Sequence, residues 1–332
     1  MSEAGIQFAV MIGYFLSSEE YTPAELLDQA RRAEEAGFEA LWISDHFHPW
    51  NDEQGQSPFV WSIIGAIAQV CSLPVTTAVT CPTTRIHPVI IAQAAATSAV
   101  LLNGEFRLGV GTGEALNEHV TGARWPSILQ RLEQLEEAVE VMRRLWTGEF
   151  VTFHGQHYTV ENARIYTRLD DPPPVYLSGF GPNAAELAGR IGDGFISTSP
   201  DREGLQRFRD SGGAGKPSQV GYKVCWGRDP EAAIDTAHRL WANSGVPGEL
   251  SQVLPSPKHF EQVSGLVTRD MTRRAIAYGS DVQRHVEAFR PFAEAGFDEV
   301  YLSQIGGRDR NSDIAGFFDF YRDEVLPALR KI

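Results

Sequence analysis

The sequence predicts an α/β fold, a (β/α)8 barrel of the TIM type with insertions. Short apolar runs alternate with amphipathic helical segments along the 332 residues, and this alternation is typical of parallel strands joined by right-handed crossovers. Eight strands can be expected from it, the number that closes such a barrel. Because α/β barrels reach this length as one domain, residues 1–332 are expected to form a single domain.

A repeated unit supports closure of the barrel. Residues 35–44 read EAGFEALWIS and residues 294–303 read EAGFDEVYLS. Gly37 and Gly296 occupy the position after a helix where a left-handed residue ends it. The same helix end, turn and strand near both ends of the chain suits a barrel whose early and late strands are neighbours.

The first part of the chain is expected to contain four strand and helix units. Residues 6–14 form an apolar run that closes in Gly13, and Thr22, Pro23 and Glu25 form a capping box that opens a helix through Ala36. The other strands are expected at 39–44, 74–80 and 107–111, and the other helices at 58–70, 88–102 and 127–146.

Residues 148–167 interrupt the alternation with a small hairpin whose strands are expected at 150–153 and 157–160. A glycine-rich flexible stretch at 211–216 and an irregular insertion with short helices at 246–279 are also expected. The regular elements are strands at 174–178, 194–198, 219–226 and 299–304, and helices at 182–191, 203–210, 231–243, 281–295 and 314–329.

Composition narrows the possible partners and the compartment. A net charge of −14 argues against a nucleic-acid partner or an anionic membrane, because phosphate contacts need clustered cations. Cys71, Cys81 and Cys225 match no disulfide framework or ligand spacing, which favours a reducing compartment. With no apolar run of about 18 residues and no cationic leader, we expect a cytoplasmic protein.

Polar or glycine-rich segments follow the first five predicted strands. In a parallel α/β barrel these carboxyl ends form the rim that carries the chemistry. The opposite strand ends are mainly tight turns such as Gly37 and Gly296. The rim residues are Ser17, Ser18 and Glu19; Asp45, His46 and Trp50; Thr80, Cys81 and Thr83; residues 111–118; and residues 179–183.

Each rim residue has a structural interpretation beside the chemical one. His46 either exchanges a proton near neutral pH or forms a hydrogen bond to a loop carbonyl. Asp45 either sets the tautomer of His46 or caps the next turn, and Trp50 is either a pocket wall or core. His48, one residue from a proline, is expected at the surface or behind the site.

The two glycine-rich loops, residues 111–118 and 179–183, also have both a chemical and a structural interpretation. Glu114 is either a poised carboxyl or an acid that interacts with a helix dipole, and residues 179–183 either bind an anion or make a tight turn. Glu19 and Glu114 form a conceivable glycosidase pair whose separation the sequence does not give. His46 and His48 lack a third metal ligand, and nucleophile-elbow and Walker motifs are absent.

Four motifs together resemble the luciferase-like (bacterial luciferase superfamily) flavin and deazaflavin oxidoreductases. They are SDHFHPW at 44–50, CPTTRIHP at 81–88, GVGTGEALNE at 109–118 and SGFGP at 178–182. Within that superfamily they are most similar to the branch of coenzyme F420-dependent glucose-6-phosphate dehydrogenases and secondary-alcohol dehydrogenases. The resemblance covers nearly the whole chain and implies a barrel, usually a homodimer, with the deazaflavin across the carboxyl rim.

The resemblance also implies roles for single residues. Asp45 and His46 would lie against the deazaflavin and the substrate hydroxyl, and His46 would accept the hydroxyl proton as hydride passes to C5. Trp50 would pack on the reacting centre, Glu114 would protonate the N1 side of the reduced cofactor, and Glu19 would complete the pocket. The implied cofactor-binding residues are Asp45, the cis pair Ala78 and Val79, Gly111, Thr112, Gly113, Asn117, Ser178, and Gly179, Phe180 and Gly181 around the phosphate.

The sequence departs from the glucose-6-phosphate pattern where the phosphate would bind. Asp201 and Arg202 follow the sixth strand where a lysine is expected, and Gln262 stands near the second lysine position. Arg202, Arg273 or Arg274 are possible substitutes, so phosphate stays open, but a neutral alcohol or unphosphorylated sugar is favoured. The alternatives are an FMN-dependent monooxygenase and a barrel that binds a deazaflavin or flavin without turnover.

Overall fold

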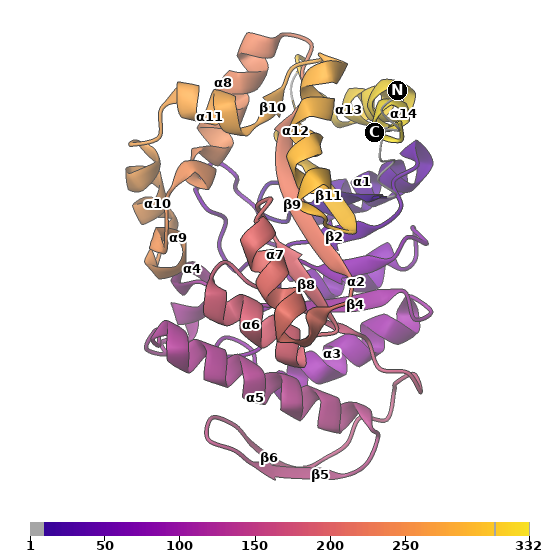
Figure 1. Ribbon diagram of the computed structural model, residues 1–332, viewed down its shortest axis with the longest axis vertical. Helices are drawn as coiled ribbons and strands as arrows, with labels where there is room; N and C mark the ends of the chain where they lie inside the picture. The colour runs from indigo at the N-terminus through magenta and orange to yellow at the C-terminus, as the bar shows by residue number, and fades with distance from the viewer. Residues whose placement is uncertain (1–9, 309, 332) are drawn as a thin grey trace.

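The computed structural model describes residues 10–308 and 310–331, and within them parallel strands close a barrel surrounded by helices (Figure 1). The hydrogen-bonded order is β9-β11-β1-β2-β3-β4-β7-β8, and pairing of β8 with β9 closes the ring. The predicted (β/α)8 barrel is therefore confirmed. Its strands are β1 (Met11–Leu16), β2 (Leu41–Ile43), β3 (Val75–Thr77), β4 (Phe106–Val110), β7 (Val175–Ser178), β8 (Gly194–Ser197), β9 (Ser218–Cys225) and β11 (Glu299–Gln304).

Helices cover the outside of this barrel (Figure 1). The predicted capping box is present, because the Thr22 side chain accepts from the Glu25 amide while the Glu25 carboxylate accepts from the Thr22 amide. The helices are α1 (Pro23–Ala36), α2 (Val60–Ile67), α3 (Pro88–Leu101), α5 (Ile128–Trp146), α6 (Pro182–Ile191), α7 (Arg202–Phe208), α8 (Pro230–Trp241), α12 (Val282–Ala295), α13 (Ile314–Phe320) and α14 (Leu326–Leu329). No helix of the described residues is both long enough and apolar enough to cross a bilayer.

The sequence repeat corresponds to neighbouring parts of the barrel. Gly37 ends α1 with φ 89° and Gly296 ends α12 with φ 91°, both in the left-handed region that glycine tolerates. Strand β1 lies between the two repeated strands, β2 and β11. The expectation that early and late strands are neighbours is confirmed.

Large side chains fill the barrel interior, so the barrel is a packed core without a pore. The rings of Trp42 and Tyr301 stack with centroids 4.5 Å apart. Glycines make room for this layer, because a Cβ at Gly221 would lie 2.3 Å from the Trp42 ring and a Cβ at Gly109 would lie 1.9 Å from the Thr77 carbonyl oxygen. The interior is filled below the rim, which leaves the rim loops as the place for a ligand.

The first strand differs from its prediction. Residues 6–9 lie outside the described residues, and β1 continues two residues beyond Tyr14. Gly13 lies inside the strand, where a Cβ would meet the Tyr301 ring at 2.3 Å. Gly13 is therefore needed for packing across the barrel. The prediction treats it as the end of the strand, because a single glycine often marks a turn.

Two other segments also depart from their predicted form. Arg209–Gly213 follows α7 as a π-helical turn that is kinked at Gly212, which has φ 108°, so the stretch predicted as a flexible loop at 211–216 begins inside this turn. The helix predicted at 314–329 is divided by the π-helical turn Tyr321–Val325 between α13 and α14. The predicted hairpin is present beside α5, with β5 (Val151–His154) and β6 (Thr159–Ala163) displaced slightly along the chain (Figure 1).

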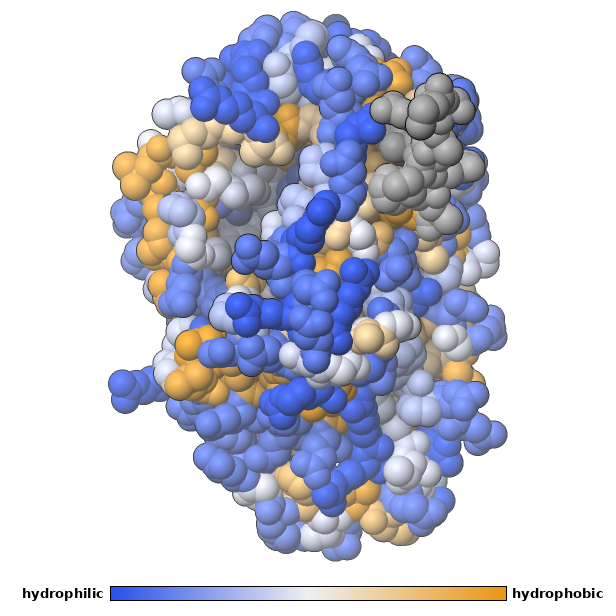
Figure 2. All heavy atoms as spheres, in the orientation of Figure 1, coloured by the Kyte–Doolittle hydropathy of each residue, from blue (hydrophilic) through white to orange (hydrophobic). Residues whose placement is uncertain are grey.

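The insertion after α8 forms an excursion at the carboxyl side of the barrel. It contains α9 (Leu250–Val253), α10 (Pro257–Ser264), α11 (Arg269–Ala275) and the short strand β10 (Ala277–Tyr278), which pairs with β9. Asn51 and Gln54 of the loop after β2 both donate to the Leu240 carbonyl at 2.9 Å, which ties α8 to that loop. The molecular surface is hollowed between the excursion and α7 (Figure 2).

Candidate active site

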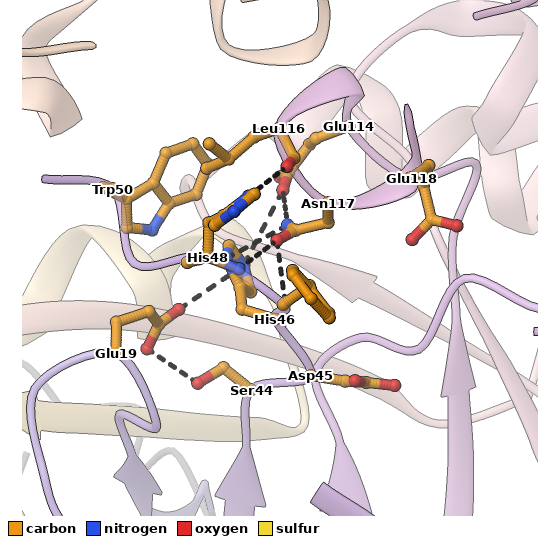
Figure 3. Close-up of polar contacts among 12 residues, drawn as sticks. Glu19, Ser44, Asp45, His46, His48, Trp50, Glu114, Leu116, Asn117 and Glu118 are labelled. Atoms are coloured by element: carbon orange, nitrogen blue, oxygen red, sulfur yellow. Dashed lines mark hydrogen bonds and ion pairs between the residues drawn. The ribbon is translucent and has the colours of Figure 1, made fainter. Parts of the chain in front are cut away.

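Three rim loops converge on the imidazole of His46 (Figure 3). Its Nε2 atom lies 3.4 Å from Oε1 of Glu19, from the loop after β1, and 3.7 Å from Oε2 of Glu114, from the loop after β4. The His46 ring is 11% exposed. One imidazole nitrogen therefore faces two carboxyl groups, and the three side chains come from the carboxyl ends of β1, β2 and β4, with β3 lying between the last two.

Asn117 in α4 (Ala115–Glu118) fixes the loop that carries His46. Its Oδ1 accepts from the Phe47 and His48 amides at 2.9 and 3.1 Å, so its Nδ2 is the donor that meets Glu114 Oε2 at 3.0 Å. The same Nδ2 lies 3.1 Å from Nδ1 of His46. This amide therefore orients both the imidazole and the Glu114 carboxyl group.

The Nδ1 atom of His46 has a partner in either tautomer. A protonated Nδ1 donates to the His48 carbonyl at 3.2 Å, and an unprotonated Nδ1 accepts from Asn117 Nδ2. Nε2 can therefore gain or lose a proton while Nδ1 stays hydrogen-bonded, which suits a group that exchanges protons.

Glu19 is held as a buried anion. Its side chain is 3% exposed, and its Oε2 accepts from the hydroxyls of Ser17 and Ser44, each at 2.8 Å. Burial acts to raise its pKa, but attraction to His46 and Lys223, together with hydrogen bonds from its own backbone amide and from the Ser44 hydroxyl, outweighs burial, so the pKa lies below the ordinary value. Glu19 is therefore ionised at neutral pH.

Glu114 behaves in the opposite way. Burial, and then repulsion from Glu19, raise its pKa above the ordinary value, against the attraction of His46, the Asn117 hydrogen bond and Arg131. Its side chain is 27% exposed, so protons can reach it from solvent. The pKa values of Glu19 and Glu114 are therefore shifted in opposite directions beside one imidazole. This pattern is typical of a site in which one carboxyl group is an anion and the other is a proton donor.

Trp50 forms an aromatic wall beside His46. Its ring centroid lies 5.0 Å from that of His46 (Figure 3). It lies 4.9 Å from the ring centroid of Phe260 in α10. Its amide donates to Gln54 Oε1 at 2.8 Å, which fixes the turn that presents it. The excursion thus contributes to the wall of the site through Phe260.

Asp45 points away from His46 (Figure 3). Its carboxylate accepts from Thr80 Oγ1 and from Arg85 Nη2, each at 2.8 Å. The interpretation in which Asp45 sets the tautomer of His46 is wrong, because Asn117 and the His48 carbonyl occupy that place. Arg85 also contacts Glu118, and burial raises the Glu118 pKa to about 7 in spite of Arg85. Asp45 therefore joins the loop after β2 to the loop after β3 through Thr80 and Arg85.

The loops implied to bind a cofactor adjoin this site. The peptide bond between Ala78 and Val79 is cis, as the resemblance implies. A Cβ at Gly111 would lie 2.8 Å from Val79 Cγ2, so that glycine permits close packing of the two loops. Gly113 has φ 75°, and the hydroxyl of Thr112 lies 3.4 Å from Arg131 Nη1.

The start of α6 is suited to an anion. Ser178 ends β7, and the loop residues Gly179, Phe180 and Gly181 lead into α6 at Pro182. Among the residues that the structure describes, no side chain caps this ten-residue helix, and a Cβ built at Gly181 meets nothing within 4 Å. Free amides at a helix start with open space before them fit a phosphate group such as that of the implied cofactor. The described residues contain no cluster of three or more His, Cys, Asp or Glu side chains suited to a metal ion.

Lys223, Glu20 and Trp241 belong to the site although sequence reasoning did not select them. Lys223 lies in β9 near Glu19 and Glu20, with Nζ 3.4 Å from the centroid of the Trp241 ring. The sequence does contain a signal for Lys223. Gln219, Gly221 and Lys223 alternate along one strand and so share one face, and Lys223 is one of only four lysines in the chain.

Comparisons with known proteins identify the family of this chain. The model of the luciferase-like monooxygenase family matches residues 6–299. An F420-dependent glucose-6-phosphate dehydrogenase of Kribbella flavida is 36% identical over 98% of this chain and 99% of its own length. One of Amycolatopsis mediterranei is 34% identical over 97% of this chain and 99% of its own length.

Solved structures show the same relationship. An F420-dependent secondary alcohol dehydrogenase in complex with an F420-acetone adduct is 33% identical and superposes with a TM-score of 0.87, covering 96% of this chain and 99% of that chain. At 20% identity and a TM-score of 0.73, the coenzyme F420-dependent tetrahydromethanopterin reductase from Methanopyrus kandleri, covering 96% of this chain and 99% of that one, shares the fold. This chain therefore belongs to the luciferase-like monooxygenase family.

Proposed function

We propose that this protein is a coenzyme F420-dependent dehydrogenase that oxidises a neutral alcohol or an unphosphorylated sugar at a carbinol carbon. The observation that carries the proposal is the position of His46 Nε2 between an ionised Glu19 and a Glu114 with raised pKa at the rim. The relatives named for F420-dependent dehydrogenase activity support the cofactor.

The residues of the site account for the proton transfers of such an oxidation. When bound, the deazaflavin supplies the acceptor for the hydride that leaves the carbinol carbon. Nε2 of His46 accepts the hydroxyl proton, and the Glu19 anion at 3.4 Å stabilises the imidazolium that results. Glu114 holds the proton that neutralises the reduced cofactor after hydride transfer. Glu114 then takes up another proton from solvent.

The remaining residues of the site position the reactants. The uncapped start of α6 would hold the cofactor phosphate, and the loop with Gly111, Thr112 and Gly113 would lie along the cofactor beside Ala78 and Val79. Trp50 and Phe260 form an apolar wall that excludes water from the reacting hydroxyl.

The arrangement of arginines supports a substrate without phosphate. Arg202 donates to the Glu294 carbonyl at 2.5 Å, and Asp201 accepts from Gly204 as the cap of α7. Arg273 donates to both carboxylate oxygens of Glu231 and to the Tyr278 hydroxyl. Two of the three arginines that were possible substitutes for the phosphate lysines are therefore already engaged with other groups.

A titration and a substrate screen test both halves of the proposal. The purified protein is titrated with coenzyme F420 and with FMN, and the F420 complex is then offered secondary alcohols, glucose and glucose 6-phosphate while deazaflavin absorbance is followed. We expect F420 binding and bleaching by a neutral alcohol or sugar. Binding of FMN alone would favour a monooxygenase, and turnover restricted to glucose 6-phosphate would refute the substrate class.

We also propose that the protein is a cytoplasmic homodimer, as in the branch it resembles. Light scattering of the purified protein at several concentrations tests the oligomeric state, and a monomer at all of them would refute it.

A further inference from the structure

Lys223 is a lysine inside the mouth of the barrel. It follows Gln219 and Gly221 on the face of β9 that packs against Trp42, and its Nζ lies 3.4 Å from the centroid of the Trp241 ring and 4.9 Å from that of Phe15. A cation on the face of an indole is attracted by the ring quadrupole. The Trp241 indole is the nearer of the two aromatic rings on which this cation lies.

The same indole holds a carboxylate at its edge. Nε1 of Trp241 donates to Oε1 of Glu20, and the amide of Gly306 donates to Oε2 at 2.9 Å. Glu20 is as buried as Glu19. Trp241 therefore connects a cation on its face with an anion at its edge, and four separate segments of the chain meet there.

Glu19 and Glu20 are adjacent buried acids that need a compensating charge. Burial, and then repulsion from Glu19, raise the Glu20 pKa to about 7, whereas Lys223 and the two N–H donors lower it. Burial lowers the Lys223 pKa, and both acids raise it. The other charged or titratable groups that face these acids are His46 and Glu114 beside Glu19, and Tyr14, Tyr21 and Arg308 around Glu20.

We propose that Lys223 is a positioning residue, whose ammonium group, held on the Trp241 indole near Glu19 and Glu20, keeps Glu19 charged beside Nε2 of His46. The inference rests on the proposed function, in which Glu19 stabilises the imidazolium. Without the ammonium group, Glu19 would retain the hydroxyls of Ser17 and Ser44 but would take up a proton at higher pH. A protonated Glu19 no longer stabilises a positive charge on His46.

The test compares Lys223→Met with Lys223→Arg and with the control Lys216→Met. Lys216 is also half-buried, but its Nζ donates to the Gly189 and Gly192 carbonyls at the far end of α6. For each variant we would measure the melting temperature, F420 affinity and the pH profile of kcat/KM with the alcohol found in the screen.

In Lys223→Met we expect the acidic limb of kcat/KM to move up by about one pH unit, with a loss that reaches about tenfold at pH values below the limb and recovery at high pH. Lys223→Arg should keep the wild-type limb, and Lys216→Met should lose stability without moving it. A uniform loss at all pH values in Lys223→Met, in proportion to a lower melting temperature, would overturn the inference. If Lys223→Met does not fold, Lys223→Gln is judged by the same profile.

A second measurement separates this inference from the proposed function. Protein labelled with ¹⁵N-histidine and free of cofactor is titrated by NMR, with the His46 signals assigned by their absence in His46→Gln. A displaced titration of His46 in Lys223→Met, with no displacement in Lys216→Met, supports the inference even if no alcohol is oxidised. Identical titrations in wild type and Lys223→Met would refute it even if the enzyme is a dehydrogenase.

Discussion

Nε2 of His46 lies 3.4 Å from Oε1 of Glu19, and this contact joins the loop after β2 to the loop after β1. Because Glu19 is ionised and almost fully buried, a proton gained by the imidazole is stabilised where it forms.

Replacing His46 by alanine should reduce kcat about 10²- to 10⁴-fold, because the acceptor of the hydroxyl proton is removed. F420 affinity should change by less than about threefold, measured by the fluorescence of the deazaflavin. His48→Gln is the matched control in the same loop, since the His48 ring is hydrogen-bonded to the Leu116 carbonyl whereas the Glu19 carboxylate faces the His46 ring. Near-normal turnover in His46→Ala would remove His46 from its role.

Replacing Glu114 by glutamine should remove the alkaline limb of the kcat profile. The pKa of Glu114 is raised, so the carboxyl group donates a proton at pH values below that pKa and loses this ability as the pH rises through it. The variant should be about 10²-fold slower and insensitive to pH in that range. Glu118→Gln, which changes the acid at the end of the adjoining helix α4 that is paired with Arg85, should keep the limb. A limb retained in Glu114→Gln would exclude Glu114.

Gly109→Ala and Gly181→Ala should have opposite effects on stability and binding. A Cβ at Gly109 meets the Thr77 carbonyl oxygen at 1.9 Å, and we expect a loss of about 1–3 kcal/mol in the free energy of unfolding. A Cβ at Gly181 meets nothing within 4 Å, so stability should stay within about 0.5 kcal/mol while F420 affinity falls. Unchanged F420 affinity in Gly181→Ala would argue against an anion at the start of α6.

Stability should fall on acidification because of the buried His285. Its Nδ1 lies 2.8 Å from the Tyr321 hydroxyl and its Nε2 lies 3.0 Å from the Gly279 carbonyl, and burial lowers its pKa from 6.5 to about 4. The unfolded chain therefore binds the proton at a higher pH than the folded protein does. The contribution of neutral His285 to the free energy of unfolding is complete above pH 6.5 and is lost as the pH falls towards 4, by up to about 3 kcal/mol.

Denaturant unfolding of wild type and His285→Gln at several pH values from 7.5 to 4.5 measures this contribution. The variant should be less stable at pH 7.5 but should show a shallower decline, because glutamine does not titrate. Parallel curves for the two proteins would assign the acid sensitivity to other groups.

Several features of the fold and site were predictable because they depend on local sequence. The capping box before α1 and the glycines after α1 and α12 act within a few residues, and their predicted conformations are observed. His46 and Glu114 were placed at the rim because each directly follows a short apolar strand. The resemblance of four motifs added the cis bond between Ala78 and Val79.

By itself, the sequence determined the barrel class and the rim position of the site, since periodicity, caps and strand ends are properties of neighbouring residues. Only the tertiary structure decided that Asp45 turns to Arg85 and that Lys223 shares the Trp241 indole with Glu20. Those contacts join residues far apart in the chain, and their geometry depends on how the barrel closes and how α8 packs over its mouth. Charge compensation in a buried site is therefore a property of packing, which no local pattern in the sequence records.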